Sequence, residues 1–204
     1  RRVLALCNGE YVAFCDGDDY WTDLTKIQEQ VDLLNRKPEA GACYHNVQFE
    51  SNEVFGKLVY GENHRAVIDF DDLMSGFFMK TCALFIRNRP DIFSPILESR
   101  LPADDTSLCF VALENNLKGI YIDKVMAVYR VHAKGIWSMI KEEQKFKWAE
   151  VSLRKYIEYY KVRYDVAPLK RQLRATMRSL SVLNLRSFKL KESLFWIISS
   201  LRNS

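Results

Sequence analysis

Short apolar runs separated by polar turns fill the first two thirds of the chain and predict alternating strands and helices. Residues 11–15 form a continuous apolar run, which is typical of a strand buried on both faces in a parallel sheet. A helix follows and ends before Lys37-Pro38, because the residue before a proline resists helical geometry. Its predicted buried face consists of apolar residues at helical spacing, namely Leu24, Ile27, Val31 and Leu34.

The later apolar segments continue this order. Strands are predicted at residues 42–49, 79–87, 120–122 and 125–131, with a short helix near 70–74 and a longer one at 106–116. From Ile140 onward the spacing is helical, and Pro168 opens a second helix. The first of these helices carries apolar residues along one side, at Phe146, Ala149, Leu153, Ile157 and Tyr160. The pattern predicts an α/β domain followed by a helical extension.

Charge changes sign where the helical pattern begins. Residues 1–138 carry 15 Lys and Arg against 20 Asp and Glu, a net charge of −5, whereas residues 139–204 carry 15 against 6, a net charge of +9. The predicted division is an acidic domain at 1–138 and a basic helical extension at 139–204. Five scattered cysteines without a Cys-x-x-Cys pair predict reduced thiols, a cytoplasmic protein and no zinc site.

The basic extension admits two interpretations. Its apolar residues between 187 and 201 either pack on the catalytic domain, or they attach the protein peripherally to the anionic inner face of the cytoplasmic membrane. Nothing in the sequence approaches the run of about 18 apolar residues that a membrane span needs.

Candidate chemistry begins where the first predicted strand ends. Asp16, Asp18 and Asp19 follow that strand, and ligands of open α/β sheets bind outside the carboxyl ends of strands. Gly17 lets the backbone bend, so that two carboxylates can converge on a divalent cation such as Mn²⁺ or Mg²⁺. The alternative is a solvated turn whose aspartates cap the following helix.

The sequence Gly-Glu-Tyr-Val-Ala-Phe-Cys-Asp-Gly-Asp-Asp-Tyr-Trp at residues 9–21 closely resembles the central signature of family 2 glycosyltransferases of the GT-A fold. The resemblance covers about residues 3–138 and is typical of bacterial, inverting members. It continues in family order at Lys26 and Gln30, at Tyr44-His45-Asn46, at residues 79–87 and at Tyr129-Arg130-Val131-His132. It implies a partial GT-A mixed sheet flanked by helices. It also implies that the first strands of that fold, with most nucleoside contacts, precede residue 1, so that this fragment alone is expected to be inactive.

The resemblance implies a metal-dependent, non-processive transfer of a sugar from a nucleotide-sugar donor to a saccharide or lipid-linked acceptor. Asp18 would be the metal ligand and Asp16 a ribose or shared contact, with the metal assisting departure of the diphosphate. His132 is a further candidate metal ligand, against a purely structural role. Trp137 is expected on a loop over the donor and Thr81 at a substrate contact on the acceptor side.

Two acids open the predicted helix at residue 106. Asp104 and Asp105 are expected as helix caps from the sequence alone. The resemblance instead implies that one of them is the general base for the acceptor hydroxyl, and matching the motif points to Asp105, with Asp104 as its neighbour. A single base opposite a leaving group implies inversion at the sugar carbon.

Two other classes of protein fit parts of the pattern. A haloacid-dehalogenase-type phosphatase also places Asp-x-Asp after an apolar strand, but here Asp19-Tyr20 and Trp21 follow, which is atypical of that site. The basic extension also fits a nucleic-acid-binding module, although it contains no recognisable recognition motif. We therefore expect no nucleic-acid partner.

Overall fold

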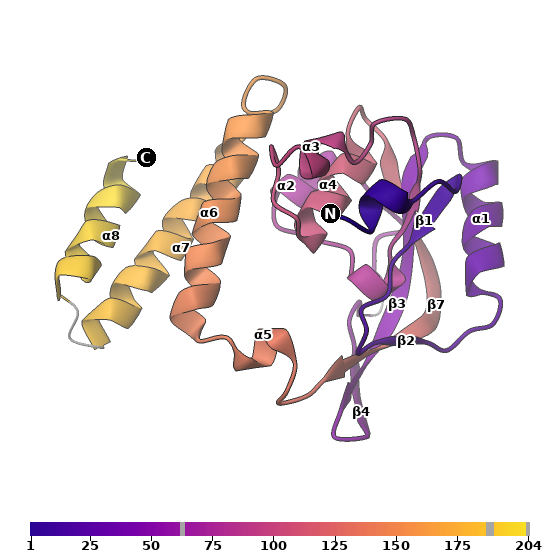
Figure 1. Cartoon of the computed structure of the whole chain (residues 1–204), viewed down its shortest axis with the longest axis horizontal. Helices are drawn as coiled ribbons and strands as arrows, with labels where there is room; N and C mark the ends of the chain where they lie inside the picture. The colour runs from indigo at the N-terminus through magenta and orange to yellow at the C-terminus, as the bar shows by residue number, and fades with distance from the viewer. Residues whose placement is uncertain (62–63, 187–189, 203–204) are drawn as a thin grey trace.

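The computed structural model describes residues 1–61, 64–186 and 190–202 (Figure 1). Its strands form one seven-stranded sheet in the order β1-β6-β3-β7-β2, with β4 paired to β3 and β5 to β7. Only the long pair β3 and β7 is parallel among the strand pairs described, so the sheet is mixed. The strands are β1 (Tyr11–Ala13), β2 (Tyr20–Trp21), β3 (Ala40–Ser51), β4 (Val54–Leu58), β5 (Val67–Ile68), β6 (Phe85–Arg87) and β7 (Lys118–Val131).

Helices cover both faces of the sheet and continue beyond it (Figure 1). The α-helices are α1 (Lys26–Arg36), α2 (Phe70–Met74), α3 (Ser94–Leu97), α4 (Asp105–Leu113), α5 (Ile136–Met139), α6 (Glu142–Tyr160), α7 (Ala167–Arg186) and α8 (Leu190–Arg202). Two short 3-10 helices, η1 (Leu4–Leu6) and η2 (Thr81–Ala83), precede β1 and β6. Among the described residues, none of the helices combines the length and the apolar character needed to cross a membrane.

Two hydrophobic clusters lie on opposite faces of the sheet. The smaller cluster, under α1, contains Leu34, Cys43 and Phe85. The larger one lies under α2 and α4 and extends into α6 and α7, where Tyr160 and Met177 are fully buried. The helices beyond residue 138 therefore share a core with the α/β part, and the predicted boundary at 138/139 stays a prediction.

The predicted α/β order with a helical end is confirmed, but the first strand is shorter than predicted and its pairing is not parallel. The strand β1 is three residues long, half-buried at both ends, and pairs antiparallel with β6 at one end of the strand order. Both of its faces are nevertheless covered, because Val12 belongs to the larger hydrophobic cluster and Tyr11 and Ala13 pack against the smaller one. The continuous apolar run therefore reflects burial on both faces, as predicted, in a strand whose pairing is antiparallel.

The predicted strand at 79–87 is mostly replaced by η2, because the amide of Leu84 bonds back to the carbonyls of Lys80 and Thr81. Only Phe85–Arg87 remains a strand. The predicted strands at 120–122 and 125–131 are one continuous strand, β7. Its register against β3 shifts near His45 and Asn46, which accounts for the interruption in the apolar pattern.

The predicted buried face of α1 is right at Leu34 and wrong at Leu24 and Ile27. Leu24 is fully exposed and Ile27 is exposed, whereas the buried positions of the helix are Lys26, Gln30 and Leu34. Hydrogen bonds explain the difference. Lys26 Nζ donates to Gln30 Oε1 at 2.7 Å, and Gln30 Nε2 donates to the carbonyl of Ala83 at 3.1 Å. Two hydrogen-bonded polar side chains, Lys26 and Gln30, therefore take the buried positions that the apolar spacing assigned to Leu24 and Ile27.

Candidate functional site

Strand direction brings four separate segments to one end of the sheet. Since β6 is antiparallel to both β1 and β3, the strands β1, β3 and β7 all run the same way. Their carboxyl ends carry the acidic turn (residues 16–19), Glu50 and the segment 129–132, while Lys80 lies just before the start of β6. The predicted position of the site, outside the carboxyl end of the first strand, therefore coincides with a meeting point of four chain segments.

Hydrogen bonds hold the acidic turn against the end of β7. The amide of Arg130 donates to Asp19 Oδ1 at 3.0 Å, and the guanidinium of Arg130 donates to the carbonyl of Asp18. His132 Nε2 lies 3.2 Å from Asp18 Oδ2. The turn is closed by a bond of 3.1 Å from the amide of Asp19 to the carbonyl of Asp16. Asp18 and His132, both predicted as metal ligands, are thus in direct contact.

The carboxylates of the site influence one another strongly. Partial burial, and then the negative charges around it, raise the pKa of Asp16 to about 6. Among these charges, that of Asp105 has the largest effect on the pKa. Burial also raises the pKa of Asp19, against the amide bond from Arg130 that lowers it. Like charges this close favour a cation between them. The sequence-predicted metal turn and the sequence-predicted base are therefore neighbours.

The two acids at the start of α4 have different surroundings. Asp104 is the N-cap, and its carboxylate accepts bonds from the amide of Ser107 at 2.9 Å, from Tyr156 OH at 2.5 Å and from Ser152 Oγ at 3.2 Å. Asp105 is exposed at the first position of the helix, near enough to the acidic turn for its charge to raise the pKa of Asp16. Because Asp104 is engaged by the helix and by α6, Asp105 is the acid whose oxygens are left for a substrate.

Two further residues of the site were not assigned a role from the sequence. Burial and the charges of four aspartates of the site raise the pKa of Tyr129. The ammonium of Lys80 lies 4.7 Å from the ring centroid of Tyr129 and 4.8 Å from that of Phe78, and its charge lowers the pKa of Asp19. Lys80 lies in the segment 79–87 and Tyr129 in the segment 129–132, both of which resemble the family, and this resemblance is the sequence signal that could have identified them.

Thr81 and Trp137 are placed less directly. Thr81 is buried in η2, next to Cys82, whose carbonyl accepts a bond from Trp21 Nε1 at 3.0 Å. Trp137 is exposed on α5, and the ammonium of Lys145 on α6 lies 5.0 Å from its ring centroid. The contact that fixes Trp137 is therefore with α6 rather than with the acidic turn, and its assignment to the donor stays a prediction.

An open pocket of about 390 Å³ adjoins the acidic turn. It extends from Gly17 and Asp18 to the β3–β4 turn, and its other wall is the end of β7 at Arg130, Val131 and His132. The turn between β3 and β4 is tight, with left-handed backbone at Asn52 and Glu53. The site therefore has space on the side of the Asp18–His132 pair for a small polar ligand.

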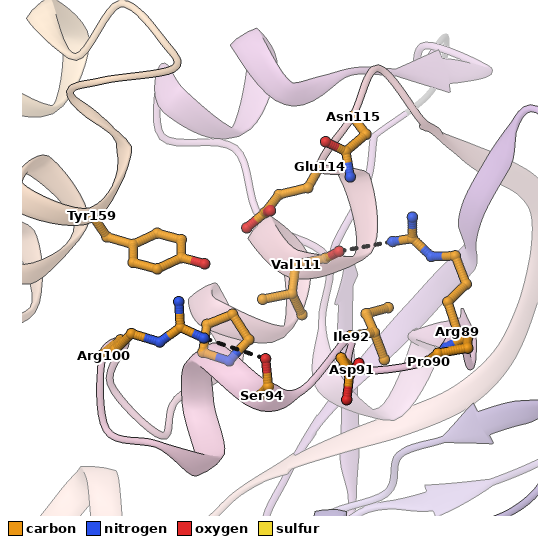
Figure 2. Close-up of a pocket in the computed structure, with 11 residues that line it drawn as sticks. Arg89, Pro90, Asp91, Ile92, Ser94, Arg100, Val111, Glu114, Asn115 and Tyr159 are labelled. Atoms are coloured by element: carbon orange, nitrogen blue, oxygen red, sulfur yellow. Dashed lines mark hydrogen bonds between the residues drawn. The ribbon is translucent and has the colours of Figure 1, made fainter.

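A second pocket, of about 200 Å³, lies between α3, the end of α4 and α6 (Figure 2). Several of its polar groups are paired within the protein, although the buried Arg89 Nε has no hydrogen-bond partner among the described residues. Arg89 donates to the carbonyl of Val111 at 3.0 Å, Arg100 donates to Ser94 Oγ at 3.3 Å, and Glu114 accepts a bond from Tyr160. It lies at the opposite end of α4 from Asp105, so the acidic turn is the better candidate site.

Fold and site together define a GT-A-like protein: a mixed α/β sheet with carboxylates at its carboxyl edge, followed by C-terminal helices. Residues 1–91 match the model of the family named Glycosyl transferase family 2, so this part of the chain is similar to family 2 glycosyltransferases. The matched part contains the acidic turn and Lys80.

Two curated relatives are the uncharacterized proteins Rv1520 of Mycobacterium tuberculosis and Mb1547 of Mycobacterium bovis. Each is 31% identical over 155 residues, a stretch that covers 72% of this chain and 42% of the relative. The chain thus spans less than half the length of these relatives. The structure is also similar to S. aureus TarS 1-349, with a TM-score of 0.55 and 14% identity, covering 99% of this chain and 57% of that one. At that identity the likeness shows the fold alone.

Proposed function

We propose that this chain is part of a nucleotide-sugar-dependent glycosyltransferase that transfers one sugar per encounter, with inversion, to a saccharide or lipid-linked acceptor. The observation that carries the proposal is the position of Asp105. Its charge raises the pKa of Asp16, so it lies beside the acidic turn, while Asp104 is taken up by its own hydrogen bonds. One unengaged carboxylate opposite a diphosphate site is the arrangement that an inverting displacement needs.

Asp105 acts in this proposal as the general base. It accepts the proton of the acceptor hydroxyl as the hydroxyl oxygen forms a bond to the anomeric carbon. The bond between that carbon and the diphosphate oxygen breaks on the opposite face, and the diphosphate leaves with the electron pair. Asp105 must then lie within about 3 Å of the hydroxyl, directly or through one water.

Asp18 and His132 are the proposed ligands of Mn²⁺ or Mg²⁺, and Asp16 is the proposed ribose contact. No group of three or more candidate ligand residues gathers in the described part of the chain. A contacting pair fits a cation of this kind, which takes one or two protein ligands and completes its shell with phosphate oxygens and water. When bound, the cation would neutralise charge on the departing diphosphate. Asp18 and His132 would orient that diphosphate in the pocket beside the turn.

The two other classes fit less well. A haloacid-dehalogenase-type phosphatase would use Asp16 as its nucleophile, yet the pairs β1–β6 and β3–β6 are antiparallel and the fold is GT-A-like. Phosphate release from a simple phosphoester, lost in Asp16→Asn, would decide for that class. A nucleic-acid-binding module would require steep salt-dependent binding to DNA or RNA.

The test is an Asp18→Ala variant of the protein that contains this chain. Sugar transfer and donor hydrolysis are measured over a panel of nucleotide-sugars with Mn²⁺, with Mg²⁺ and in excess chelator. We expect activity to be lost in the variant and in chelator, with the melting temperature almost unchanged, because Asp18 is partly exposed beside an open pocket. The control is Asp71→Ala, an exposed acid on α2. Full activity in chelator contradicts the metal assignment.

A further inference from the structure

The last helix, α8, exposes apolar side chains to solvent. It is the outermost element of the C-terminal helices and packs against α7 (Figure 1). Its contact side includes the buried Ser193 and Ser200 and the half-buried Trp196, which packs against the larger hydrophobic cluster, and Ser193 Oγ lies 3.1 Å from Ser181 Oγ of α7. The outer side carries large apolar residues that are 42–60% exposed, at Leu194, Phe195, Ile197 and Ile198. We call these four residues the apolar stripe.

The neighbouring helix α7 is basic. Its 20 residues include five Lys or Arg and no Asp or Glu. Arg171, Arg178 and Arg186 are exposed. The two helices run antiparallel, and the Ser181–Ser193 contact sets the apolar stripe level with positions 176–180 of α7 (Figure 1). Exposed guanidinium groups therefore lie along the helix that flanks the apolar stripe.

We propose that α7 and α8 attach this protein peripherally to an anionic lipid surface. The apolar stripe enters the interface between headgroups and acyl chains, and the arginines of α7 contact the lipid phosphates. With 13 residues α8 is about 20 Å long, well short of the roughly 30 Å hydrocarbon core. It therefore lies in the plane of the surface. This inference stands on α7 and α8 alone and does not depend on the proposed function.

Charge favours an anionic lipid surface over a second copy of the chain or a nucleic acid as the partner of α7 and α8. A second copy of the chain, docked through the same face, would bring two strongly basic α7 helices together, and their repulsion opposes a symmetric pair. A nucleic acid would satisfy the arginines but would leave the apolar stripe in water. An anionic lipid surface is complementary to both the charge and the apolar side chains.

The experiment is co-sedimentation of the purified 204-residue chain with vesicles of phosphatidylcholine alone or mixed with phosphatidylglycerol. One variant combines Phe195→Ser with Ile198→Ser, and a second combines Arg171→Gln with Arg178→Gln. All four side chains are at least partly exposed, so both variants should fold, which circular dichroism checks. The matched apolar control, on the exposed strand β4, is Val54→Ser with Phe55→Ser, and the charge control is Arg36→Gln with Lys57→Gln.

We expect binding to the anionic vesicles, weakened about tenfold or more in each α7 or α8 variant and little changed in the controls. Raising the salt should weaken the binding by screening. Equal binding to neutral and anionic vesicles, or no binding to either, overturns the proposal. A second result would also overturn it: the chain binds no vesicles but self-associates in sedimentation velocity, and the Phe195→Ser, Ile198→Ser variant abolishes this self-association. The apolar stripe would then be covered by a second copy of the chain.

Discussion

The two adjacent acids at the start of α4 should respond to mutation in opposite ways. Asp104→Ala removes a carboxylate that accepts three hydrogen bonds, from Ser107, Ser152 and Tyr156. Asp105→Ala removes an exposed carboxylate at the first position of the same helix. The first change should lower stability and the second should lower turnover. The pair is matched in position, chemistry and size.

The magnitudes follow from the contacts. Loss of an N-cap costs about 1 kcal/mol, and hydrogen bonds to a charged group contribute about 1.5–3 kcal/mol each. Asp104 is half-buried and Tyr156 keeps a contact with Ser107 Oγ at 3.2 Å, so we expect about 3 kcal/mol in total. For a chain of this size that corresponds to a fall in Tm of roughly 6–12 °C. Asp105→Ala loses only an acid near a helix N-terminus, about 0.3–1 kcal/mol.

The two acids should rank in the opposite order when sugar transfer is measured instead of stability. Asp105→Asn removes the proton acceptor and keeps the shape of the side chain, so turnover should fall at least about a hundredfold. The assay combines thermal unfolding with sugar transfer measured well below the Tm of each variant, in the protein that contains this chain. Asp104→Ala should then keep most of its turnover. If Asp104→Ala abolishes transfer in a folded protein while Asp105→Asn is mild, the base has been assigned to the wrong residue.

Two further predictions concern the core beneath the site. Burial raises the pKa of the Cys43 and Cys109 thiols to about 12. An unfolded thiol titrates near 8.5, so stability should fall above about pH 8.5 by roughly 1.4 kcal/mol per pH unit for each thiol. Urea unfolding as a function of pH measures this slope, and Cys43→Ala should reduce it. A Cβ at Gly41 would lie 1.9 Å from the Ala112 carbonyl oxygen of α4, so Gly41→Ala should lower the free energy of unfolding by about 3 kcal/mol or more. The control is Gly17→Ala, which has open space around it and should cost about 0.5 kcal/mol or less. Urea unfolding measures both.

The sequence predicted the elements of the fold better than it predicted their faces. Periodicity located α1 and its buried Leu34, but the other buried positions are the hydrogen-bonded Lys26 and Gln30, which apolar spacing cannot reveal. That pair depends on the carbonyl of Ala83, 53 residues away from Gln30. The 3-10 turn η2 was missed for a related reason, because an apolar run has the same appearance in a strand and in a buried turn.

The acidic turn was found from its position after a strand, whereas its relation to Asp105 needed the structure. Local sequence left Asp104 and Asp105 as equivalent candidates, since either one can cap a helix. The partners that separate them, Ser152 and Tyr156, lie 48 and 52 residues after Asp104 on α6. The packing of α6 against α4 adds the bonds from Ser152 and Tyr156 to the N-cap bond that Asp104 already accepts from Ser107.

That packing gives the C-terminal helices a part in the site. Phe110 of α4 lies 5.0 Å from Tyr156 and 5.2 Å from Tyr160, ring centroid to ring centroid, so α6 supports α4 by ring contacts as well as by the bonds to Asp104. The acidic turn takes its support from Arg130 and His132 of the β7 end instead. A change that displaces α6 therefore acts on the helix that carries Asp105 before it acts on the turn. The base and the metal pair of the proposed enzyme are positioned by separate parts of the fold, and α6 links the first of them to the helices that we propose to lie on the membrane.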